Sequence, residues 1–375
     1  LLLNDALSCY RNFKVKNKNS RLPRSKLLFK KKTIEIFPGI DKDGLKGGAL
    51  WHDACLTDFQ RFYIELLKFS CTNGISALNY VEVTGLLQQH GVTRGVAAID
   101  IITGKKIEFK APCVINAAGP WARETAEIFD RDYPELFEKR LLLWNVLFDR
   151  EALSSHALAL SPGKGGGHYY FLLSWDGRLL AGTPEKIVEK SPAETSISQE
   201  DMDEFINDLN KIVPGLNLIQ QDIVRIYPGV LPADREGKLT KRPAIIDHAK
   251  NGGTKGLYSI AGIKFTTSRL EADRLLKQIF PKVKKLSHDK LFADLKMEHY
   301  HFAYDWQPQG DEDLNVLREI IKNEAVLHLS DLILRRTSLG DNPKRAREIL
   351  PRLRPLFDWP EKKWQEEVKL LEQQW

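Results

Sequence analysis

The sequence has little sulfur and no long apolar run, and both absences exclude classes of protein. It holds only 4 cysteines and 2 methionines among 375 residues, and no two cysteines form a C-x-x-C pair. This spacing disfavours a zinc or dithiol site and favours a reducing compartment. No apolar run reaches the roughly 18 residues that a membrane-spanning helix needs. The first ten residues, LLLNDALSCY, lack the basic region and apolar core of a signal peptide and also lack an initiator methionine.

Charge is also modest, with 56 basic against 50 acidic residues and a formal net charge of +6. This surplus fits an anionic ligand or a membrane surface, and no nucleic-acid recognition motif accompanies it, so we expect no nucleic-acid partner. Nine basic residues crowd the start of the chain: Lys14, Lys16, Lys18, Arg21, Arg24, Lys26, Lys30, Lys31 and Lys32. We interpret them as a solvated, partly mobile surface segment. The alternative is a patch that faces acidic lipid or an anionic substrate.

Few residues suggest a metal site. His299 and His301 are one residue apart, a spacing that metal ligands can have, but no cysteine or further histidine lies near them in sequence. Structural or surface roles are therefore favoured, and we expect no bound metal.

Hydrophobic periodicity predicts a mixture of helices and strands before residue 286. A helix is expected over 58–72, ended by Asn73-Gly74, with one apolar face made of Phe59, Tyr63, Leu66 and Leu67. Hairpins are expected over 95–111, turning at Thr103-Gly104, and over 168–183, turning at Asp176-Gly177. A further helix is expected over 198–212, with Ser198 as its N-cap.

The pattern changes near residue 286, where glycine becomes rare and strand patterns stop. Four helical segments follow, read as DEDLNVLREIIKNEAV, LSDLILRRTSL, NPKRAREILPRL and PEKKWQEEVKLLEQQ. Pro360 stands where the start of a helix tolerates proline. We therefore predict two parts, residues 1–285 and a small helical domain over 286–375.

Two stretches carry candidate chemistry. In 115–121, INAAGPW, an apolar strand ends in small residues that let a flat or phosphorylated ligand approach the backbone, although a tight turn alone would explain them. In 258–280, YSIAGIKFTTSRLEADRLLKQIF, a strand, a glycine turn and a helix follow one another. The turn holds Lys264 beside Thr266 and Thr267, which can cap the helix or donate to a ligand. A helix N-terminus with a lysine is a natural anion site, and the alternative is a solvated loop lysine.

These segments resemble the FAD-dependent glycerol-3-phosphate dehydrogenases, within the D-amino-acid-oxidase-like flavoproteins. The similarity lies in GGALWHDACLTDFQRF, LNYVEVTGLL, VINAAGPWARE, SIAGIKFTTSR and LSDLILRRTSLG. It implies a mixed α/β and α+β fold: an incomplete, Rossmann-like FAD-binding domain, a substrate domain on an antiparallel sheet, and a C-terminal helical domain. The LSDLILRRTSLG match separates this branch from simpler amine and amino-acid oxidases.

The resemblance places roles on matching residues. It implies that Val83 contacts the adenine side of FAD through its backbone. It implies that the strand end Ala117, Ala118 and Gly119 lies beside the dinucleotide. The loop that meets the flavin ring would be Gly262, Ile263, Lys264, Phe265 and Thr266, with its helix N-terminus stabilising negative charge on the reduced ring. Lys264 would also face the substrate.

The sequence departs from the family pattern in three places. No G-x-G-x-x-G occurs near residue 1, and GKGGG at 163–167 lacks the strand-to-helix context, so we expect the FAD domain to be truncated at its N-terminus, as in a fragment, and to hold FAD poorly. Leu231 stands where the family carries a substrate-binding arginine, and Arg235 is the candidate replacement. Asn145 stands where the family carries a histidine, and it cannot act as a general base. His52 and His168 are the candidate bases, with structural roles as the alternative.

The resemblance implies oxidation of sn-glycerol 3-phosphate, or of a related hydroxy substrate, to dihydroxyacetone phosphate by hydride transfer to flavin. Implied partners are a phosphorylated polyol and a quinone or oxygen as electron acceptor. A cytoplasmic location is expected, with peripheral contact on the inner face of the cytoplasmic membrane. Two alternatives remain: an oxidase of an amine or amino acid, which Leu231 and Asn145 favour, and a non-catalytic fragment.

Overall fold

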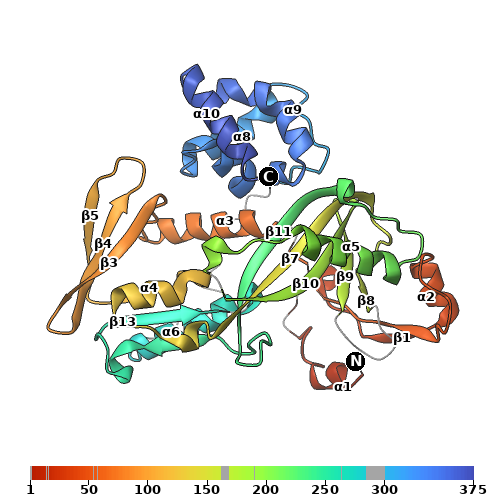
Figure 1. Cartoon of the computed structure of the whole chain (residues 1–375), viewed down its shortest axis with the longest axis horizontal. Helices are drawn as coiled ribbons and strands as arrows, with labels where there is room; N and C mark the ends of the chain where they lie inside the picture. The colour runs from red at the N-terminus through yellow and green to blue at the C-terminus, as the bar shows by residue number, and fades with distance from the viewer. Residues whose placement is uncertain are drawn as a thin grey trace.

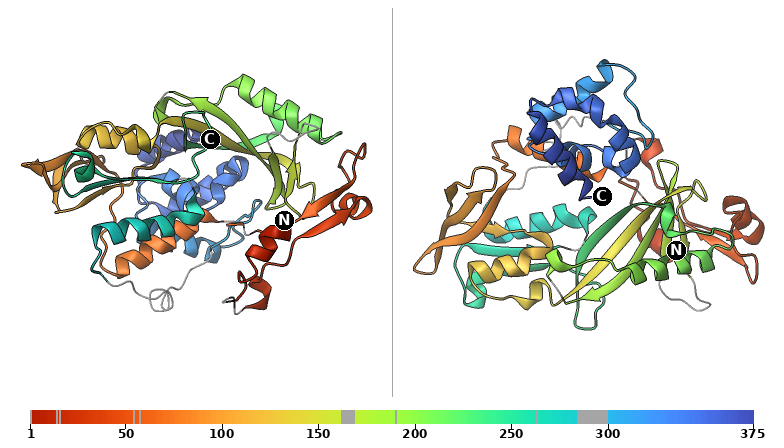
Figure 2. Two further views of the ribbon diagram at one scale, coloured as in Figure 1. Left: turned by 90° about the horizontal axis from the view of Figure 1, so that it is seen from below. Right: turned by 45° about the horizontal axis from the view of Figure 1, so that its top comes forward.

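The computed structural model describes residues 2–13, 15, 17–53, 55–56, 58–161, 169–189, 191–262, 264–283 and 300–375. In Figure 1 a group of long strands occupies the middle of the molecule, a three-stranded sheet stands at one end, and a cluster of helices lies above them. Figure 2 gives two further views of the same arrangement, and its right-hand view shows the helices of the C-terminal residues as a separate cluster. The mixed α and β architecture expected from the sequence is confirmed.

A small mixed sheet carries the stretches that the sequence singled out. Its strand order is β12-β13-β6, with β12 over Ala244–Asp247, β13 over Leu257–Ala261 and β6 over Val114–Asn116. Strand β13 runs antiparallel to β12 and parallel to β6. Helix α4 (Ala122–Phe129) follows β6, and its alanines Ala122 and Ala126 are fully buried in a core with the end of β13. The predicted strand in INAAGPW is therefore confirmed, and it leads through a short turn into α4.

A three-stranded antiparallel sheet precedes β6 in the sequence. It is formed by β3 (Val81–Gln89), β4 (Val92–Asp100) and β5 (Lys106–Lys110). Strands β4 and β5 are the hairpin that the sequence predicted at Thr103-Gly104.

The central sheet has five antiparallel strands in the order β11-β7-β10-β9-β8. Their bounds are Ile223–Ala233 (β11), Lys139–Glu151 (β7), Arg178–Val188 (β10), Tyr170–Trp175 (β9) and Leu158–Leu160 (β8). The Asp176-Gly177 turn is confirmed, since both residues have positive φ, 50° and 82°, as a two-residue hairpin requires. Helix α5 (Gln199–Ile212) packs Phe205 and Leu209 into the core of this sheet.

The cap of α5 also follows the prediction. The Ser198 hydroxyl accepts a hydrogen bond from the Asp201 backbone N–H, and the Asp201 carboxylate accepts one from the Ser198 backbone N–H. This reciprocal capping box satisfies two backbone donors that the first turn of a helix leaves without partners.

The basic N-terminal segment has more regular structure than the sequence suggested. It contains α1 (Leu2–Leu7), β1 (Lys26–Phe29), α2 (Lys30–Ile36) and β2 (Gly47–Leu50). Strands β1 and β2 pair antiparallel, which gives backbone partners to a stretch whose lysines stay exposed. Those of the nine basic residues that the structure describes are exposed, as expected for a solvated surface segment, while the short helices and strands of the segment were not predicted.

Helix α3 (Phe59–Thr72) begins at Asp58, whose carboxylate accepts from the Arg61 backbone N–H, and ends at Asn73-Gly74 as predicted. Its burial is inverted relative to its composition. The apolar face is largely exposed: Phe59 is 45% exposed, Tyr63 47% and Leu67 45%. Arg61 and Glu65 are instead buried, with exposed fractions of 1% and 3%. The charged face of α3 is the one that contacts the helical domain.

The helical domain has its own core. Its helices are α8 (Asn315–Asn323), a π-helical turn over Asp331–Arg336, α9 (Pro343–Leu353) and α10 (Glu361–Glu372). Seventeen buried hydrophobic residues from these helices and their connections form one cluster, so the four predicted helical segments are confirmed. The predicted boundary at 286 lies outside the described residues.

Buried ionic contacts join α3 to this domain. The Arg61 guanidinium donates to both carboxylate oxygens of Glu324, at 2.8 and 2.7 Å, and also pairs with Glu65. Tyr80 donates to Asp331 at 2.8 Å.

Within the described part of the chain, no helix is both long and apolar enough to cross a membrane.

Candidate functional site

The two candidate stretches meet at one edge of the small mixed sheet. Strands β6 and β13 run in parallel, with Asn116 aligned to Ser259. The residues that follow them, Ala117–Gly119 and Gly262–Lys264, therefore leave the sheet on the same side. Ligands of open α/β sheets bind at the carboxyl ends of parallel strands. The fold thus brings together segments that are about 140 residues apart in sequence.

Glycine is required at the end of the first stretch. Gly119 has φ = 57°, a left-handed conformation that costs a residue with a Cβ roughly 1–2 kcal/mol. It opens the short 3₁₀ turn Gly119–Trp121 that leads into α4. At Gly262 an added Cβ would meet no atom within 4 Å. Small side chains at both strand ends leave the backbone open to a close ligand.

The second stretch has the predicted strand, turn and helix. After β13 comes a 3₁₀ turn over Phe265–Thr267 and then α6 (Ser268–Ile279). Lys264 occupies the N-cap position of that turn, and neither Lys264 nor Thr267 caps through its side chain. The Thr267 hydroxyl instead donates to the Lys264 carbonyl at 3.0 Å. The N–H groups of Thr267 and Ser268 donate to the Lys264 and Phe265 carbonyls, so the earlier N–H groups of Phe265 and Thr266 are the ones open to an anion, which the helix dipole also favours.

Aromatic contacts anchor the Lys264 turn to α3. The ring of Phe265 lies 4.6 Å from that of Tyr63 and 5.7 Å from that of Phe62, centroid to centroid. Burial raises the pKa of the Tyr63 hydroxyl above its ordinary value. Lys264 and Thr266 themselves are exposed. The turn therefore has a fixed apolar side and a polar side that is open to solvent.

Other predicted site residues lie on other sheets. Val83 is on β3, paired with Ala98 of β4, and is 42% exposed. Asn145 lies in the middle of β7, between Gly182 of β10 and Tyr227 of β11. An added Cβ at Gly182 would lie 2.0 Å from the Asn145 amide oxygen, so the Asn145 side chain needs that glycine.

Arg235 follows β11 and forms a salt bridge with Glu138. Its side chain is 89% exposed, so the candidate substrate cation is already paired with a carboxylate at the surface. Leu231 lies on β11 itself, paired with Leu141 of β7.

Of the two candidate bases, the described part of the chain contains His52. His52 follows β2, and its Nδ1 is buried without a hydrogen-bond partner among the described residues. His168 and Ile263 lie outside the described residues. His301 contacts Asp176 at 3.2 Å, and His299 lies outside the described residues. No group of three potential metal ligands occurs in the ranges that the structure describes.

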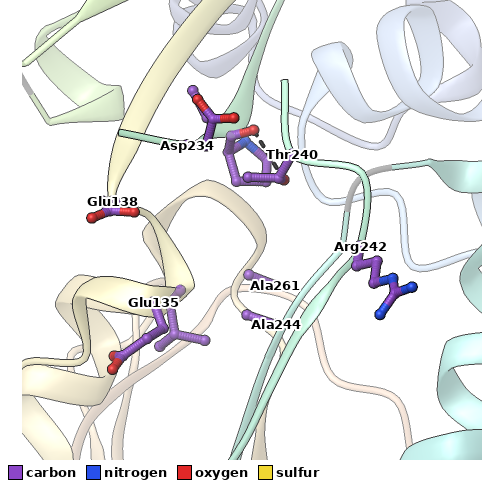
Figure 3. Close-up of a pocket in the computed structure, with 10 residues that line it drawn as sticks. Glu135, Glu138, Asp234, Thr240, Arg242, Ala244 and Ala261 are labelled. Atoms are coloured by element: carbon purple, nitrogen blue, oxygen red, sulfur yellow. Dashed lines mark hydrogen bonds between the residues drawn. The ribbon is translucent and has the colours of Figure 1, made fainter. Parts of the chain in front are cut away.

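A small hollow of about 90 Å³ lies near the ends of β11 and β13. Figure 3 shows Glu135, Glu138, Asp234 and Arg242 around it, with Ala244 and Ala261 at its wall. Three of these four charged residues are acidic, so the hollow has no surplus of positive charge to attract a phosphate.

A chain of buried polar side chains lies beneath the strand ends, and the sequence analysis missed it. Asn116, at the end of β6, donates from its amide nitrogen to the Ala122 carbonyl at 2.7 Å and accepts from the Ala118 backbone N–H at 3.2 Å. It also contacts Ser259 on β13. A polar residue between the apolar Ile115 and the small Ala117 was the only signal in the sequence.

Comparison with known proteins places this fold. The FAD dependent oxidoreductase family matches residues 5–272. The aerobic glycerol-3-phosphate dehydrogenase of Staphylococcus haemolyticus is 30% identical over 282 residues, which are 74% of this chain and 49% of that protein. The glycerol-3-phosphate dehydrogenase of Synechocystis sp. is 24% identical over 278 residues, 70% of this chain and 50% of that protein. The chain thus spans about half the length of these curated relatives.

Among solved structures, the glycerol-3-phosphate dehydrogenase of Bacillus halodurans, complexed with FAD, matches with a TM-score of 0.70 at 20% identity. The match covers 92% of this chain and 78% of that one. This likeness supports the fold, and the family match over residues 5–272 confirms the resemblance drawn from the sequence motifs. The chain belongs to the FAD dependent oxidoreductase family.

Proposed function

We propose that this protein oxidises sn-glycerol 3-phosphate, or a closely related hydroxy substrate, to dihydroxyacetone phosphate with FAD as hydride acceptor. One observation carries the proposal: the parallel ends of β6 and β13 bring Ala117–Gly119 next to the Lys264 turn, which leads into a helix N-terminus without a side-chain cap. The names of the two relatives from Staphylococcus haemolyticus and Synechocystis sp., both glycerol-3-phosphate dehydrogenases, support the choice of substrate.

The strand-end edge fits the flavin end of the cofactor. The open space at Gly262 and the left-handed backbone at Gly119 allow close approach by a planar ring. Backbone groups of Ala117–Gly119 and of Gly262 with Lys264–Thr266 would hold this end. For the pyrophosphate the 375 residues offer no G-x-G-x-x-G sequence, and GKGGG at 163–167 lies mostly outside the described residues. We therefore assign no residue of this chain to the phosphates.

When bound, FAD supplies the oxidising power by accepting a hydride from the alcohol carbon. The chain's own part is to bind, orient and charge-balance. The helix N-terminus after Lys264 stabilises negative charge beside it, and the preorganised N–H groups need not reorient as that charge develops. Lys264 adds a full positive charge in the same turn, suited to a phosphate or a developing anion. We propose His52 or His168 as the group that takes the hydroxyl proton.

Bleaching of bound flavin tests the proposal. The chain is incubated with FAD, freed of excess cofactor and titrated with glycerol 3-phosphate while its visible absorbance is recorded. Lys264→Met should lower the bleaching rate at least about tenfold, because one charge-assisted contact is lost. Lys277→Met, an exposed lysine at the other end of α6, is the matched control and should bleach like the unmodified chain. Bound flavin that does not respond to glycerol 3-phosphate would refute the proposed substrate.

A second function is favoured by one observation. The hollow near Ala261 is lined by Glu135, Glu138 and Asp234 (Figure 3), and Arg235 is already paired with Glu138. Acidic groups attract a protonated amine and repel a phosphate. We therefore propose oxidation of an amine or amino acid as the alternative, tested by adding a panel of these compounds to the same flavin-loaded sample.

The acceptor that reoxidises the flavin is tested separately. We propose a quinone, which would place the protein at the inner face of the cytoplasmic membrane as a peripheral protein, and oxygen as the alternative. Reoxidation by a soluble ubiquinone analogue without peroxide supports the quinone, whereas stoichiometric peroxide in air supports oxygen.

A further inference from the structure

Four polar side chains form a continuous buried chain beneath the candidate site. Asp130 Oδ2 lies 3.0 Å from His248 Nδ1, His248 Nε2 lies 2.9 Å from Ser259 Oγ, and the Asn116 amide nitrogen lies 3.0 Å from the same hydroxyl. His248 and Ser259 are fully buried, and Asn116 is 3% exposed. We call Asp130, His248, Ser259 and Asn116 the relay.

The relay joins four elements that are separate in sequence. Asp130 ends α4, His248 opens the 3₁₀ turn His248–Asn251, Ser259 lies in β13 and Asn116 ends β6. It therefore links both parallel strands to the helix that follows the first of them.

The hydrogen-bond partners fix the direction of every proton in the relay. The ionised Asp130 carboxylate can only accept, so His248 Nδ1 carries a hydrogen; Nε2 of the neutral ring then accepts from the Ser259 hydroxyl, and Ser259 Oγ accepts from the Asn116 amide nitrogen. His248 is then the neutral tautomer with hydrogen on Nδ1, which donates to Asp130. Burial lowers the pKa of His248, against the opposing pull of the Asp130 carboxylate. A neutral imidazole is therefore the form that fits this chain.

A serine, a histidine and an aspartate in this order also occur in hydrolytic triads, and burial excludes that role here. A nucleophile must reach a substrate carbonyl, and both Ser259 and His248 have no exposed surface. Among the described residues, Asn116 connects the relay to the candidate site. It accepts a hydrogen bond from the Ala118 backbone N–H at 3.2 Å and donates one to the Ala122 carbonyl at 2.7 Å. These two bonds flank the turn that contains Gly119.

We propose that the relay positions the Ala117–Gly119 backbone for the cofactor, so that breaking it weakens FAD binding even when the fold persists. This inference rests on the proposed function, because it takes the strand-end edge as the flavin site. Asn116 is a positioning residue in this scheme, since its amide holds the turn through Ala118 and Ala122. Ser259 and His248 act one and two steps further away by fixing the orientation of the Asn116 amide.

The far end of the relay is firmly held. Asp130 accepts hydrogen bonds from the Tyr133 hydroxyl at 3.0 Å and the Thr254 hydroxyl at 3.1 Å. Gly253 leaves room for this carboxylate, because a Cβ there would lie 2.0 Å from Asp130 Oδ2. Burial raises the pKa of Asp130, but the bonds from His248, Tyr133 and Thr254 outweigh it and hold the pKa below its ordinary value. Asp130 is therefore an ionised anchor.

Protonation of His248 breaks the directional order. Both ring nitrogens then donate, so the Ser259 hydroxyl hydrogen loses its acceptor inside a buried site, which is costly. The charged groups that act on His248 are Asp130, Asp247 and Arg131, and the Tyr133 ring lies 4.4 Å from the imidazole. Acid should consequently loosen the Ala118 turn as His248 becomes charged.

The test compares Ser259→Ala and His248→Gln with the unmodified chain. Ser154→Ala is the matched control, since it removes a serine hydroxyl that donates a hydrogen bond, to the Ile36 carbonyl at 2.8 Å, in another part of the fold. Three quantities are measured in each sample: exchange of the Ala118 amide hydrogen by NMR, the melting temperature, and the dissociation constant of added FAD from flavin fluorescence. Both relay variants should speed Ala118 exchange and weaken FAD binding by about tenfold, while the control changes neither.

The outcomes separate the relay from the proposed function. A relay variant that lowers only the melting temperature, with Ala118 exchange and FAD affinity unchanged, shows a purely structural cluster and overturns the proposal. If the unmodified chain binds no FAD, the proposed function fails, and the relay's hold on the turn is still decided by Ala118 exchange in the same samples. Unchanged exchange then overturns the relay as well, whereas faster exchange supports its positioning of the turn.

Discussion

Removing the buried guanidinium of Arg61 should strongly destabilise the packing of α3 against the helical domain. Arg61 is 1% exposed and forms a two-pronged pair with Glu324 at 2.8 and 2.7 Å, with Glu65 on its other side. Burial lowers the pKa of Arg61, but the bonds to the two carboxylates outweigh it and hold the pKa above its ordinary value. Breaking a buried pair by removing one partner costs about 3–5 kcal/mol. We expect Arg61→Met to lower the free energy of unfolding by about 3–5 kcal/mol.

The size of the stability loss is set by the burial of the ion pair, and the chain offers an exposed pair for comparison. Arg347 and Glu372 form a pair of the same kind at 2.7 Å, with side chains 49% and 37% exposed. Exposed pairs contribute about 0–1 kcal/mol, so Arg347→Met should cost no more than that. Urea unfolding followed by tryptophan fluorescence would measure both variants against the unmodified chain.

The two carboxylates explain why the loss should be large. Without Arg61, Glu65 and Glu324 are left close together in a buried site, with Lys68 partly compensating at 3.3 and 3.4 Å. An uncompensated charge in a buried site is what makes removal of one partner costly. Equal losses for Arg61→Met and Arg347→Met would refute the reasoning.

Three further predictions concern the strand-end edge and the relay. Gly119→Ala should destabilise the fold by about 1–2 kcal/mol because the φ angle of Gly119 is 57°. Gly229→Ala, where an added Cβ meets open space, is the control in thermal melts. Equal shifts in melting temperature would contradict the backbone argument. Gly253→Ala should cost about 1–3 kcal/mol by overpacking against Asp130, and an unchanged melting temperature would show that the carboxylate moves freely. Stability should fall with acid, since His248 and Asp130 both have folded pKa values below their unfolded ones; the histidine's share is present above its unfolded pKa of about 6.5 and is lost as pH falls through its lower folded value. His248→Gln should remove that share of the slope between pH 7 and 5, and an unchanged slope would contradict it.

Local patterns in the sequence determined much of the fold. Capping and turn residues act over a few positions, so the bounds of α3 and α5 and the Asp176-Gly177 hairpin followed from them. The same is true of the strand, turn and helix around Lys264, and of the four helical segments after residue 311. The motifs in INAAGPW and SIAGIKFTTSR also indicated the family, because they gather unusual residues in a short stretch.

The tertiary structure alone decided which residues lie inside. On the predicted apolar face of α3, Phe59, Tyr63 and Leu67 are exposed, whereas Arg61 is buried. Helical periodicity shows that a helix has two faces, but not which face its partners cover. Here Glu324, 263 residues away, supplies the charge that lets Arg61 be buried.

The relay likewise depends on chain topology. Asn116, Asp130, His248 and Ser259 are separated by 11 to 143 residues along the hydrogen bonds that join them, and none of them stands in a motif of polar residues. Parallel pairing of β6 with β13 and the end of α4 bring them within hydrogen-bond distance. The sequence by itself therefore determined the elements and the candidate loops, whereas only the packing of distant segments decided which polar groups meet, because such contacts depend on long-range geometry that no local pattern encodes.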